Sequence, residues 1–592
     1  MALLHRLAAL FRTARAAAQS PPAVAPGPEE DDATAVVVAE AERLLASGDA
    51  RAAIALLDDP AGPRLAGHHR YRILGIAARV TGQSDVAAVE LDRALDLAPD
   101  DATALYHRGR LYLDQEDPEQ AADMFQLALI HAPLHGAAAI ELARLHRKAG
   151  RLSAAATVLE GIGAAREDAD PDVCFEHGRV LEASGRLDEA VSVYRRVLEV
   201  RPDDVAVLVQ LGLLLLDQAG DAASAERCFR RAVDADPASR EANANLALAW
   251  MAQRRLEDAV AHCDRMLELH PEFVEFRWNR GLARLLGERY REGWPDYESR
   301  KLRPRGSRAF PYPEWDGGPL HGRTILVHAE QGIGDEVMFA SCLPDLVARS
   351  GHCVIECDVR LAPLYRRSFP SATVWGAPRD GDRRWLRDVP AIDVQCAVGS
   401  LPLHLRVDAR AFPAHDGFLV ADPERVAFWR SRLAAMGAER AIGIAWTAGT
   451  LRSRMRLRSL SPSDLRQLLQ VGDVTWIALQ DSMAGFDEVD RDPVRRPQRI
   501  LDSATAAIDD VAALICALDL VVTPAGTTAH LAGALGRPVC VLVDAAGDWR
   551  WGSDNDRTAW YPSARLFRQP RAGDWRSVIG AVGEHLGARS TC

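Results

Sequence analysis

HAEQGIGDEVMF, residues 328 to 339, is the stretch around which the rest of the chain is organised. It follows an apolar and β-branched run at 324–327, which predicts a buried strand. Its two glycines predict a tight turn, and the apolar spacing of 336–346 predicts a helix. A strand, a glycine turn and a helix N-terminus place backbone N–H groups around a small hollow, with Asp335 at its edge. Asp335 is therefore either a helix-capping carboxylate or a reactive one, and these two alternatives stay open at this point.

The composition describes a chain that folds around a sizeable core. The 592 residues are 48% hydrophobic and 26% charged, and this length is enough for about four ordinary domains. The net charge of −12 argues against a general nucleic-acid binder. The ten cysteines show neither a CxxC pair nor the Cys/His spacing of a zinc site, so the sequence predicts no metal site and a reducing, cytoplasmic location. No segment has the length and apolarity of a transmembrane helix.

Residues 1–33 are predicted to form a short N-terminal helix and a Pro-rich acidic linker, SPPAVAPGPEEDD at 20–32. Three arginines, Arg6, Arg12 and Arg15, interrupt the apolar runs, which excludes the continuous apolar core of a signal peptide. The helix is either an amphipathic contact for a membrane or partner, or a frayed chain end.

Residues 34–304 carry an internal repeat. Prolines 99, 133, 202, 237 and 271 are separated by 34, 69, 35 and 34 residues, so one proline is skipped in a period of about 34. Small and large residues recur in phase with this period. They are Gly75, Gly109, Gly178, Gly212 and Gly281, then Ala87, Ala121, Ala155, Ala190 and Ala259, then Leu91, Phe125, Leu159, Tyr194 and Phe229. The pattern predicts a tetratricopeptide α-solenoid of seven or eight helix pairs with a concave groove. The groove either binds an extended partner or belongs to a rigid spacer or dimerisation arm.

The pattern changes to alternating strands and helices after residue 305, which predicts an α/β region. The predicted strands form two sets, 324–329, 353–357, 372–375 and 391–396, then 441–446, 474–479, 519–523 and 539–543. Two such sets predict two Rossmann-like lobes, 305–420 and 421–592, with a cleft between them. The join to the repeats contains no long flexible tract, so we expect the last repeat to be docked against this region.

Polar residues follow the second set of strands, where ligands of parallel sheets bind. Arg452, Arg454, Arg456 and Arg458 alternate along one segment, and one or two of them are expected to hold a phosphorylated ligand, the alternative being a solvated loop. A Gly/Thr-rich helix N-terminus offers N–H groups and hydroxyls to phosphate. The candidate ligand contacts are Thr447, Gly449, Arg452, Arg458, Gln480, Gly526, Thr527, Thr528 and His530.

Four stretches together resemble a known family. They are HAEQGIGDEVMF, GIAWTAG at 443–449, IDDVAALICALDLVVTPAGTTAHLAGALGRPV at 508–539, and DWRWGSDNDRTAWYPSARLFRQ at 548–569. They look like the heptosyltransferase-like GT-B glycosyltransferases, and more closely like bacterial proteins that join such a domain to tetratricopeptide repeats. The resemblance implies a GT-B fold for the two lobes and a metal-independent enzyme.

The resemblance also implies roles for individual residues. Asp335 matches the family's catalytic base, carried by an acceptor-lobe glycine turn that comprises Gln331, Gly332 and Gly334. Residues 526–530 match the contact to the nucleotide-sugar phosphates, and Asp510 matches an acidic position near the donor. The chain departs from the family at Ala525, where an Asp is usual. This departure implies either a different donor or weakened activity.

The expected function is transfer of a sugar from a nucleotide-sugar to a protein acceptor that the repeats recruit. O-linked N-acetylglucosaminyltransferases and flagellin-modifying enzymes have a similar two-part layout, so flagellin is the leading acceptor and an activated nonulosonic acid the matching donor. No cofactor is expected beyond the nucleotide-sugar co-substrate. The alternatives are a transferase acting on lipopolysaccharide or another glycan, and a non-catalytic scaffold or chaperone with a degenerate transferase domain.

Overall fold

The computed structural model describes residues 32–57, 67–164, 169–303, 308–378, 383–448, 455–471, 474–480, 497–501 and 507–588. The expected N-terminal helix and linker lie almost wholly outside these ranges. The chain divides into two compact units, residues 1–211 and 212–592, and each is described by itself.

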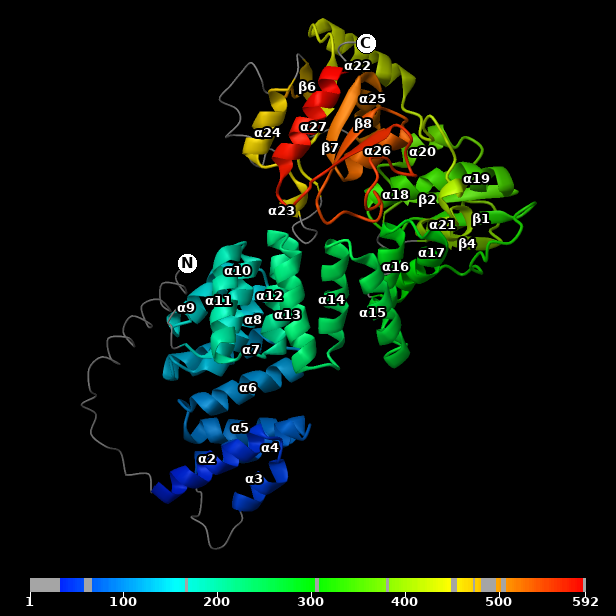
Figure 1. The fold of residues 1–592 in the computed structure, drawn as a ribbon. Coiled ribbons are helices and arrows are strands. Elements are labelled where there is room, and N and C mark those ends of the chain that lie inside the picture. The colour runs from blue at the N-terminus through cyan, green and yellow to red at the C-terminus, as the bar shows by residue number, and fades with distance from the viewer. Residues whose placement is uncertain are drawn as a thin grey trace. The chain divides into compact units, whose positions relative to one another are not determined.

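The first unit consists of helices that pack in consecutive pairs (Figure 1). They are α2 (Asp32–Ala46), α3 (Ala50–Leu57), α4 (His68–Val80), α5 (Ser84–Leu97), α6 (Ala102–Asp114), α7 (Pro118–His131), α8 (Gly136–Lys148), α9 (Leu152–Gly161), α10 (Pro171–Ala183), α11 (Leu187–Val200) and the start of α12 (Val205–Leu214). The in-phase glycines explain how closely they pack. A Cβ at Gly109 would lie 2.6 Å from the Phe125 ring, and one at Gly178 would lie 2.4 Å from the Tyr194 ring. The small and the large residues that recur in the sequence therefore contact each other in the fold.

The second unit begins with the remaining repeat helices. A π-helical turn, η1 (Leu215–Ala219), ends α12, and α13 (Ala222–Ala235), α14 (Arg240–Ala252), α15 (Leu256–Leu269), α16 (Val274–Leu286) and α17 (Tyr290–Tyr297) follow, with the 3₁₀ turn η2 (Glu298–Leu302) after them. Within the described residues the helices from α2 to α17 make eight pairs, which confirms the expected number.

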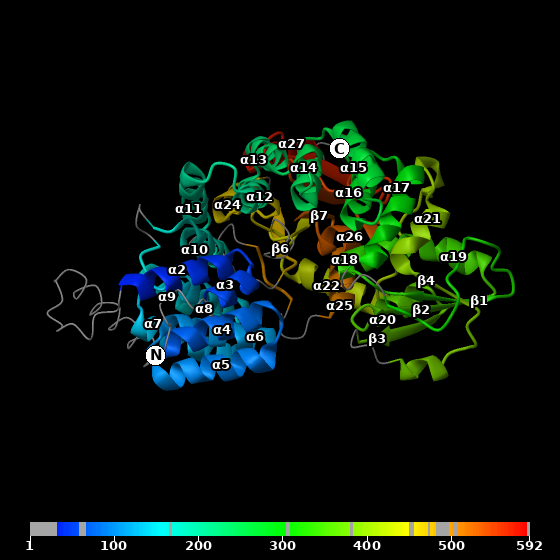
Figure 2. The same cartoon turned by 90° about the horizontal axis from the view of Figure 1, so that it is seen from below.

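The first α/β half contains a parallel sheet in the order β3-β2-β1-β4, seen in Figure 2. Its strands are β1 (Thr324–His328), β2 (His352–Asp358), β3 (Thr373–Ala377) and β4 (Val394–Ala397). The accompanying helices are α18 (Ile333–Phe339), α19 (Leu343–Arg349), α20 (Ala362–Ser368) and α21 (Leu401–Leu405). The four strands that the sequence predicts here are confirmed.

The second α/β half contains a parallel sheet in the order β6-β5-β7-β8-β9. Its strands are β5 (Ala441–Ile444), β6 (Thr475–Ala478), β7 (Leu520–Pro524), β8 (Val539–Val543) and β9 (Ala564–Arg568), and its helices are α22 (Pro423–Ala435), α23 (Met455–Arg458), α24 (Pro462–Leu469), α25 (Ile508–Ala517), α26 (Thr527–Ala534) and α27 (Trp575–Ala588). Alternate strand residues pack against α24 and α27 on one face and against α22, α25 and α26 on the other. These helices are labelled in Figure 1. Helices thus cover both faces, as the strand–helix alternation predicts.

Two expectations about elements need correction. The helix expected at 336–346 starts earlier, at Ile333, and breaks into α18, a 3₁₀ turn at Ala340–Cys342, and α19. Pro344 explains the break, because it has no N–H to continue the helical hydrogen bonds. The strand β9 is not among the predicted strands, because its residues ARLFR lack the β-branched side chains that mark the other strands.

The expected docking of the last repeat is confirmed. The Trp294 indole N–H of α17 donates to the Arg406 carbonyl at 2.8 Å, and the Trp294 ring lies edge-on to Trp549 at 5.8 Å. One continuous hydrophobic core runs from α15–α17 through the first sheet into the second. The last repeats are therefore part of the same folded unit as the two sheets.

Candidate active site

Asp335 lies in the first turn of α18, just beyond the end of β1. Its Oδ1 accepts from the Arg550 Nε at 2.6 Å, and Oδ2 accepts no hydrogen bond from the described residues. Its side chain makes no hydrogen bond to the backbone of its own helix within those residues. Within the described residues Asp335 is therefore an ion-paired carboxylate with one oxygen held, and not a side-chain cap of α18.

The glycine turn brings Asp335 to the second sheet. Helix α18 packs directly against α26, and a Cβ at Gly334 would lie 3.3 Å from both Thr527 Oγ1 and His530 Cδ2. Any larger residue at position 334 would crowd this contact. The expected catalytic residue and the expected phosphate-binding segment, which are distant in the sequence, are thus neighbours in the fold.

The N-terminus of α26 has no side-chain cap. Gly526 precedes the helix in an extended conformation and caps it without a side chain. The N–H groups of the first turn, residues 527–529, meet no acceptor among the described residues, and the dipole of the helix favours negative charge there. Thr527 is exposed, and Gly526 and Thr528 are half-buried, so a ligand can approach them.

The sheet topology indicates the same place. In the second sheet β5 lies between β6 and β7, so the strand order reverses between β5 and β7, where ligands of such sheets bind. The two strand ends come together there, because a Cβ at Gly526 would lie 3.3 Å from the Ala448 Cβ.

The corresponding point of the first sheet, between β1 and β4, is filled by the protein itself. Arg300 of η2 is buried there, with its Nη2 2.9 Å from Glu330 and 2.6 Å from Ser400, and Glu330 also accepts from the Gly399 N–H at 3.0 Å. Burial opposes the charge of Arg300, but Glu330 and Glu298 outweigh it and raise the pKa of the guanidinium. The second sheet therefore offers the more open of the two ligand positions.

A chain of alternating charges joins Asp335 to the second sheet. Arg550 donates to Asp335 at 2.6 Å and to Asp548 at 2.9 Å, and Arg458 donates to Asp548 at 3.4 Å and to the Ala525 carbonyl at 2.9 Å. Burial opposes the charge of Asp548, but Arg550 and Arg458 outweigh it and hold the pKa of that carboxyl well below its ordinary value. Burial also opposes the charge of Arg550, but Asp335 and Asp548 outweigh it and raise the pKa of the guanidinium. Asp548 and Arg550 are therefore both charged near neutral pH.

His530 is buried and held by contacts to two aromatic side chains. Burial lowers its pKa to about 4, so the imidazole is neutral near pH 7. Its Nδ1 lies 3.0 Å from the Tyr561 hydroxyl, and its ring stacks on Trp551 at 4.8 Å. The neutral ring is held between Tyr561 and Trp551 and lies next to Gly334. It therefore contributes no positive charge to the N-terminus of α26.

The structure places the other expected site residues as follows. The Gln480 Oε1 accepts from the Trp446 and Thr447 N–H groups at 2.8 and 3.0 Å, so Gln480 fixes the segment that follows β5. Gln331 donates to the Tyr297 hydroxyl at 2.8 Å, which ties the glycine turn to the last repeat. Gly449 and Arg452 lie outside the described residues.

Asp510 lies apart from this cluster. It accepts from the Arg425 Nε at 2.9 Å and from the Trp429 indole N–H at 3.0 Å, both on α22. None of its hydrogen bonds within the described residues reaches α26. Its expected place near the donor thus finds no support in these contacts.

Sequence reasoning missed Asp548, Arg550 and Tyr297 as site residues. Asp548 and Arg550 belong to the stretch DWRW that carries the family resemblance, so a role could have been sought there. The pairing of Arg550 with Asp335 follows only from the fold, because it joins residues 215 positions apart.

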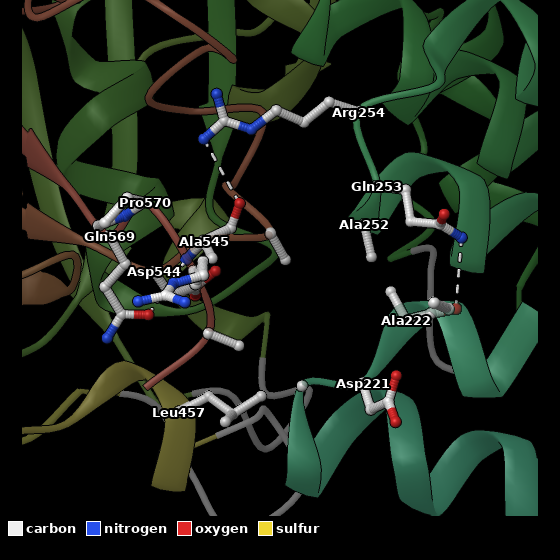
Figure 3. A pocket seen from close by; sticks show the side chains of 15 residues that line it. Asp221, Ala222, Ala252, Gln253, Arg254, Leu457, Asp544, Ala545, Gln569 and Pro570 are labelled. Atoms are coloured by element: carbon white, nitrogen blue, oxygen red, sulfur yellow. Dashed lines mark hydrogen bonds between the residues drawn. The ribbon is translucent and has the colours of Figure 1, made fainter. Parts of the chain in front are cut away.

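Two cavities lie beside the cluster, between repeat helices and the α/β region. The larger, of about 610 Å³, is lined by Gly220, Asp221, Ala222, Ala223, Ala252, Gln253, Arg254, Leu457, Asp544, Ala545, Ala546, Gln569, Pro570, Arg571 and Ala572 (Figure 3). Arg254 reaches across it and donates to the Ala545 carbonyl at 3.4 Å. The smaller, of about 330 Å³, extends to Gln331, Asp548 and Arg550. The two cavities share Ala252 and Ala546 as wall residues.

The described residues also bear on other kinds of site. They contain no group of three or more His, Cys, Asp or Glu side chains suited to a metal ion. No helix in the same residues has both the length and the apolarity needed to cross a bilayer.

Comparison with known proteins shows which family the chain belongs to. Models of the tetratricopeptide repeat match residues 74–132, 175–225 and 214–272, and a second such model matches 112–173. Protein FlbA of Caulobacter vibrioides is 32% identical over 485 residues, which span 78% of this chain and 80% of FlbA. The chain belongs to the FlbA family. The alignment with FlbA is longer than the segment 74–272 that the repeat models match. The similarity to FlbA therefore includes residues outside that segment.

Three other known proteins resemble smaller parts of this FlbA-family protein. Human tetratricopeptide repeat protein 7A is 35% identical over 88 residues, 15% of this chain and 10% of that protein. The solved structure of YrrB, described as a TPR protein with an unusual peptide-binding site, is 25% identical and covers 29% of this chain and 88% of YrrB with a TM-score of 0.26. The structure of PilF from Pseudomonas aeruginosa is 15% identical and covers 36% of this chain and 95% of PilF with a TM-score of 0.32.

Proposed function

We propose that this protein is a metal-independent GT-B glycosyltransferase that moves a sugar from a nucleotide-sugar to a protein acceptor. The observation that carries the proposal is the contact of Gly334 with Thr527 and His530, because it sets a carboxylate beside an open helix N-terminus. Two parallel sheets covered by helices support the GT-B architecture. The tetratricopeptide repeats support a protein acceptor, since such arrays present binding surfaces.

The proposed mechanism uses the residues in these positions. The free Oδ2 of Asp335 takes the proton of an acceptor hydroxyl as its oxygen attacks the anomeric carbon. The bond between that carbon and the donor phosphate breaks, and the departing phosphate takes the bonding electrons. The N–H groups of 527–529 and the guanidinium of Arg550 or Arg458 stabilise its growing charge. The family resemblance implies inversion at the sugar.

Ala525 bears on the choice of donor. Its backbone carbonyl accepts from Arg458 at 2.9 Å, and Asp548 provides the carboxylate next to that guanidinium. We propose that Asp548 and Asp544 take over the electrostatic role of the Asp that is usual at 525. The resemblance makes an activated nonulosonic acid the first donor and flagellin the first acceptor to test.

The test is transfer by the purified full-length chain, followed by intact-protein mass spectrometry of flagellin incubated with the activated nonulosonic acid. We expect a mass increase of one or more sugars, and a rate lowered about 10²-fold or more in Asp335→Asn. The matched control is Asp234→Asn, which changes an exposed aspartate of α13 and should leave the rate unchanged.

Two results would contradict the proposal. An unchanged rate in Asp335→Asn, with unfolding temperatures that match the wild type, removes the role as base. Neither transfer nor binding with any nucleotide-sugar, as measured by calorimetry on the full chain, favours the non-catalytic scaffold.

A further inference from the structure

The smaller cavity has an apolar wall supplied by the repeats. We call it the apolar pocket. The large apolar residues of its wall are Leu216 of η1, Leu248 and Met251 of α14, and Trp278, Leu282 and Leu286 of α16, and one carboxylate, Asp217 of η1, lines the same side. Leu248, Met251, Trp278 and Leu282 are only half-buried. Apolar surface left open to water favours an occupant by about 25 cal/mol per Å² covered. At about 330 Å³ the pocket is at the small end of ligand sites, and suits part of a larger ligand.

The other end of the apolar pocket is polar and meets the candidate active site. Gln331, Asp548 and Arg550 line it there. Arg550 is the residue that holds Asp335 at 2.6 Å, so whatever fills the pocket lies next to the proposed base. The pocket is thus continuous with the reaction site and not a separate surface feature.

This division into an apolar wall and a polar end selects among occupants. A sugar carries hydroxyls around its ring, and most of those facing the repeat helices would lose their hydrogen bonds to water, because Asp217 is, among the described residues, the one charged side chain that lines the pocket on that side. A peptide segment fits better, because one side chain can be wholly apolar while a neighbouring residue carries the hydroxyl.

The larger cavity has room for the rest of such a peptide segment. It shares Ala252 and Ala546 with the apolar pocket, and its lining includes the polar side chains of Asp221, Gln253, Arg254, Asp544 and Gln569 (Figure 3). Backbone N–H and C=O groups of an extended chain need partners when they leave water, and these side chains supply both donors and acceptors. The lining also contains two carboxylates and two guanidinium groups, so it does not select strongly by charge.

We infer that an extended segment of the acceptor protein lies along both cavities and places a large apolar side chain in the apolar pocket. That side chain belongs to a residue within two positions of the modified hydroxyl. The inference rests on the proposed function for the identity of the reaction, but the pocket itself is tested by binding alone.

The test uses fluorescently labelled peptides of about ten residues with a central serine, roughly 33 Å when extended. One position at a time is occupied by Leu, Phe, Ala, Asp or Lys, and affinity for the full-length chain is measured by fluorescence anisotropy. We expect Leu or Phe at one position within two residues of the serine to bind about tenfold tighter than Asp. Leu282→Glu should erase this preference. Equal affinities at every position, or a preference that persists in Leu282→Glu, would overturn the inference.

A second variant keeps the test sharp if Leu282→Glu folds poorly. Leu282→Ala enlarges the pocket and should shift the preferred residue from Leu toward Phe or Trp, and an unshifted preference contradicts the assignment. Leu269→Glu is the matched control, because Leu269 lies on the neighbouring α15 with 70% of its surface exposed and outside both cavities. Its preference should match the wild type. Thermal unfolding of each variant reports whether it is folded.

The two proposals fail separately. A clear apolar preference in binding, with no sugar transferred from any donor, leaves the peptide site standing and removes the proposed function. Transfer to flagellin with the same KM in Leu282→Glu as in the wild type leaves the function standing and removes the peptide site.

Discussion

At the scale of single residues, Arg550 connects the two halves of the candidate site. It is the hydrogen-bond partner of Asp335 and also pairs with Asp548, and these three side chains are only 15–20% exposed. An arginine fork can hold two carboxylates in fixed directions, which a single ammonium cannot do. Asp335 therefore depends on a residue of the second sheet for its orientation.

This dependence predicts the effect of removing the guanidinium. Arg550→Gln should lower transfer about 10²-fold and cost about 2 kcal/mol of unfolding free energy, because two partly buried carboxylates lose their partner. Arg550→Lys should recover more of the stability than of the rate, since it restores charge without the fork. Steady-state kinetics and urea unfolding measure the two effects. Arg291→Gln removes an arginine that is 73% exposed and should change neither; equal losses in both variants would contradict the assigned role.

A second prediction at this scale concerns pH. Burial lowers the pKa of His262 to about 4, against 6.5 for an unperturbed histidine. The unfolded chain then binds a proton at a higher pH than the folded chain, so the stability is complete above about pH 6.5 and declines as the pH falls toward 4. Between pH 6.5 and 4.5 this one histidine should account for about 2 kcal/mol of lost unfolding free energy.

The measurement is urea unfolding of the wild type and of His262→Leu across that range. The variant should lose less stability on acidification, whereas the control His321→Leu, which changes an exposed histidine, should follow the wild type. Parallel curves for all three proteins would show that the lowered pKa of His262 does not govern this range.

At the scale of elements, the regular parts of the fold could be predicted because their patterns are local. The 34-residue period gave the helix pairs, and apolar runs gave eight of the nine strands described. The strand β9 escaped because its residues ARLFR are not a typical strand sequence. The interruption of the helix at Pro344 could have been predicted from the proline itself, which has no N–H to donate. The apolar spacing of 336–346 does not take this into account.

The repeat glycines give the prediction at this scale. A Cβ at Gly212 of α12 would lie 2.5 Å from the Phe229 ring, which is fully buried, so Gly212→Ala should cost about 1–3 kcal/mol of unfolding free energy. Gly580 of α27 has no neighbour within 4 Å of its missing Cβ, so Gly580→Ala should gain about 0.5–1 kcal/mol from helix propensity. Urea unfolding compares the two. The same sign for both variants would mean that helix propensity, and not the contact with Phe229, decides the outcome.

At the scale of the whole molecule, the site residues that sequence reasoning found are those that follow strands. Asp335 and residues 526–530 could be found because strand ends can be read from the sequence. The ion pair of Asp335 with Arg550 and the filling of the first sheet's ligand position by Arg300 could not, because both depend on contacts between distant segments. Arg300 in particular enters the first sheet only because the last repeat is docked there.

The same docking alters where the chain can be cut. The sequence pattern favours a boundary near 305, yet the compact unit runs from 212 to 592. Tyr290, Trp294 and Tyr297 of α17 are at most 5% exposed and pack against the α/β region. A fragment 305–592 would lose these rings and expose the apolar surface that they cover, a common cause of aggregation.

We therefore predict that residues 204–592, which start just before α12, form a stable fragment, whereas residues 305–592 do not. The longer fragment should melt cooperatively within about 5 °C of the corresponding transition of the full chain, since the cut removes no contact internal to the unit. The shorter one should be insoluble or melt at least about 10 °C lower. Differential scanning calorimetry of the three proteins measures this. A fragment 305–592 that is soluble and melts with the full chain would mean that the last repeats pack on the sheets without stabilising them, and that the core they share is not one cooperative unit.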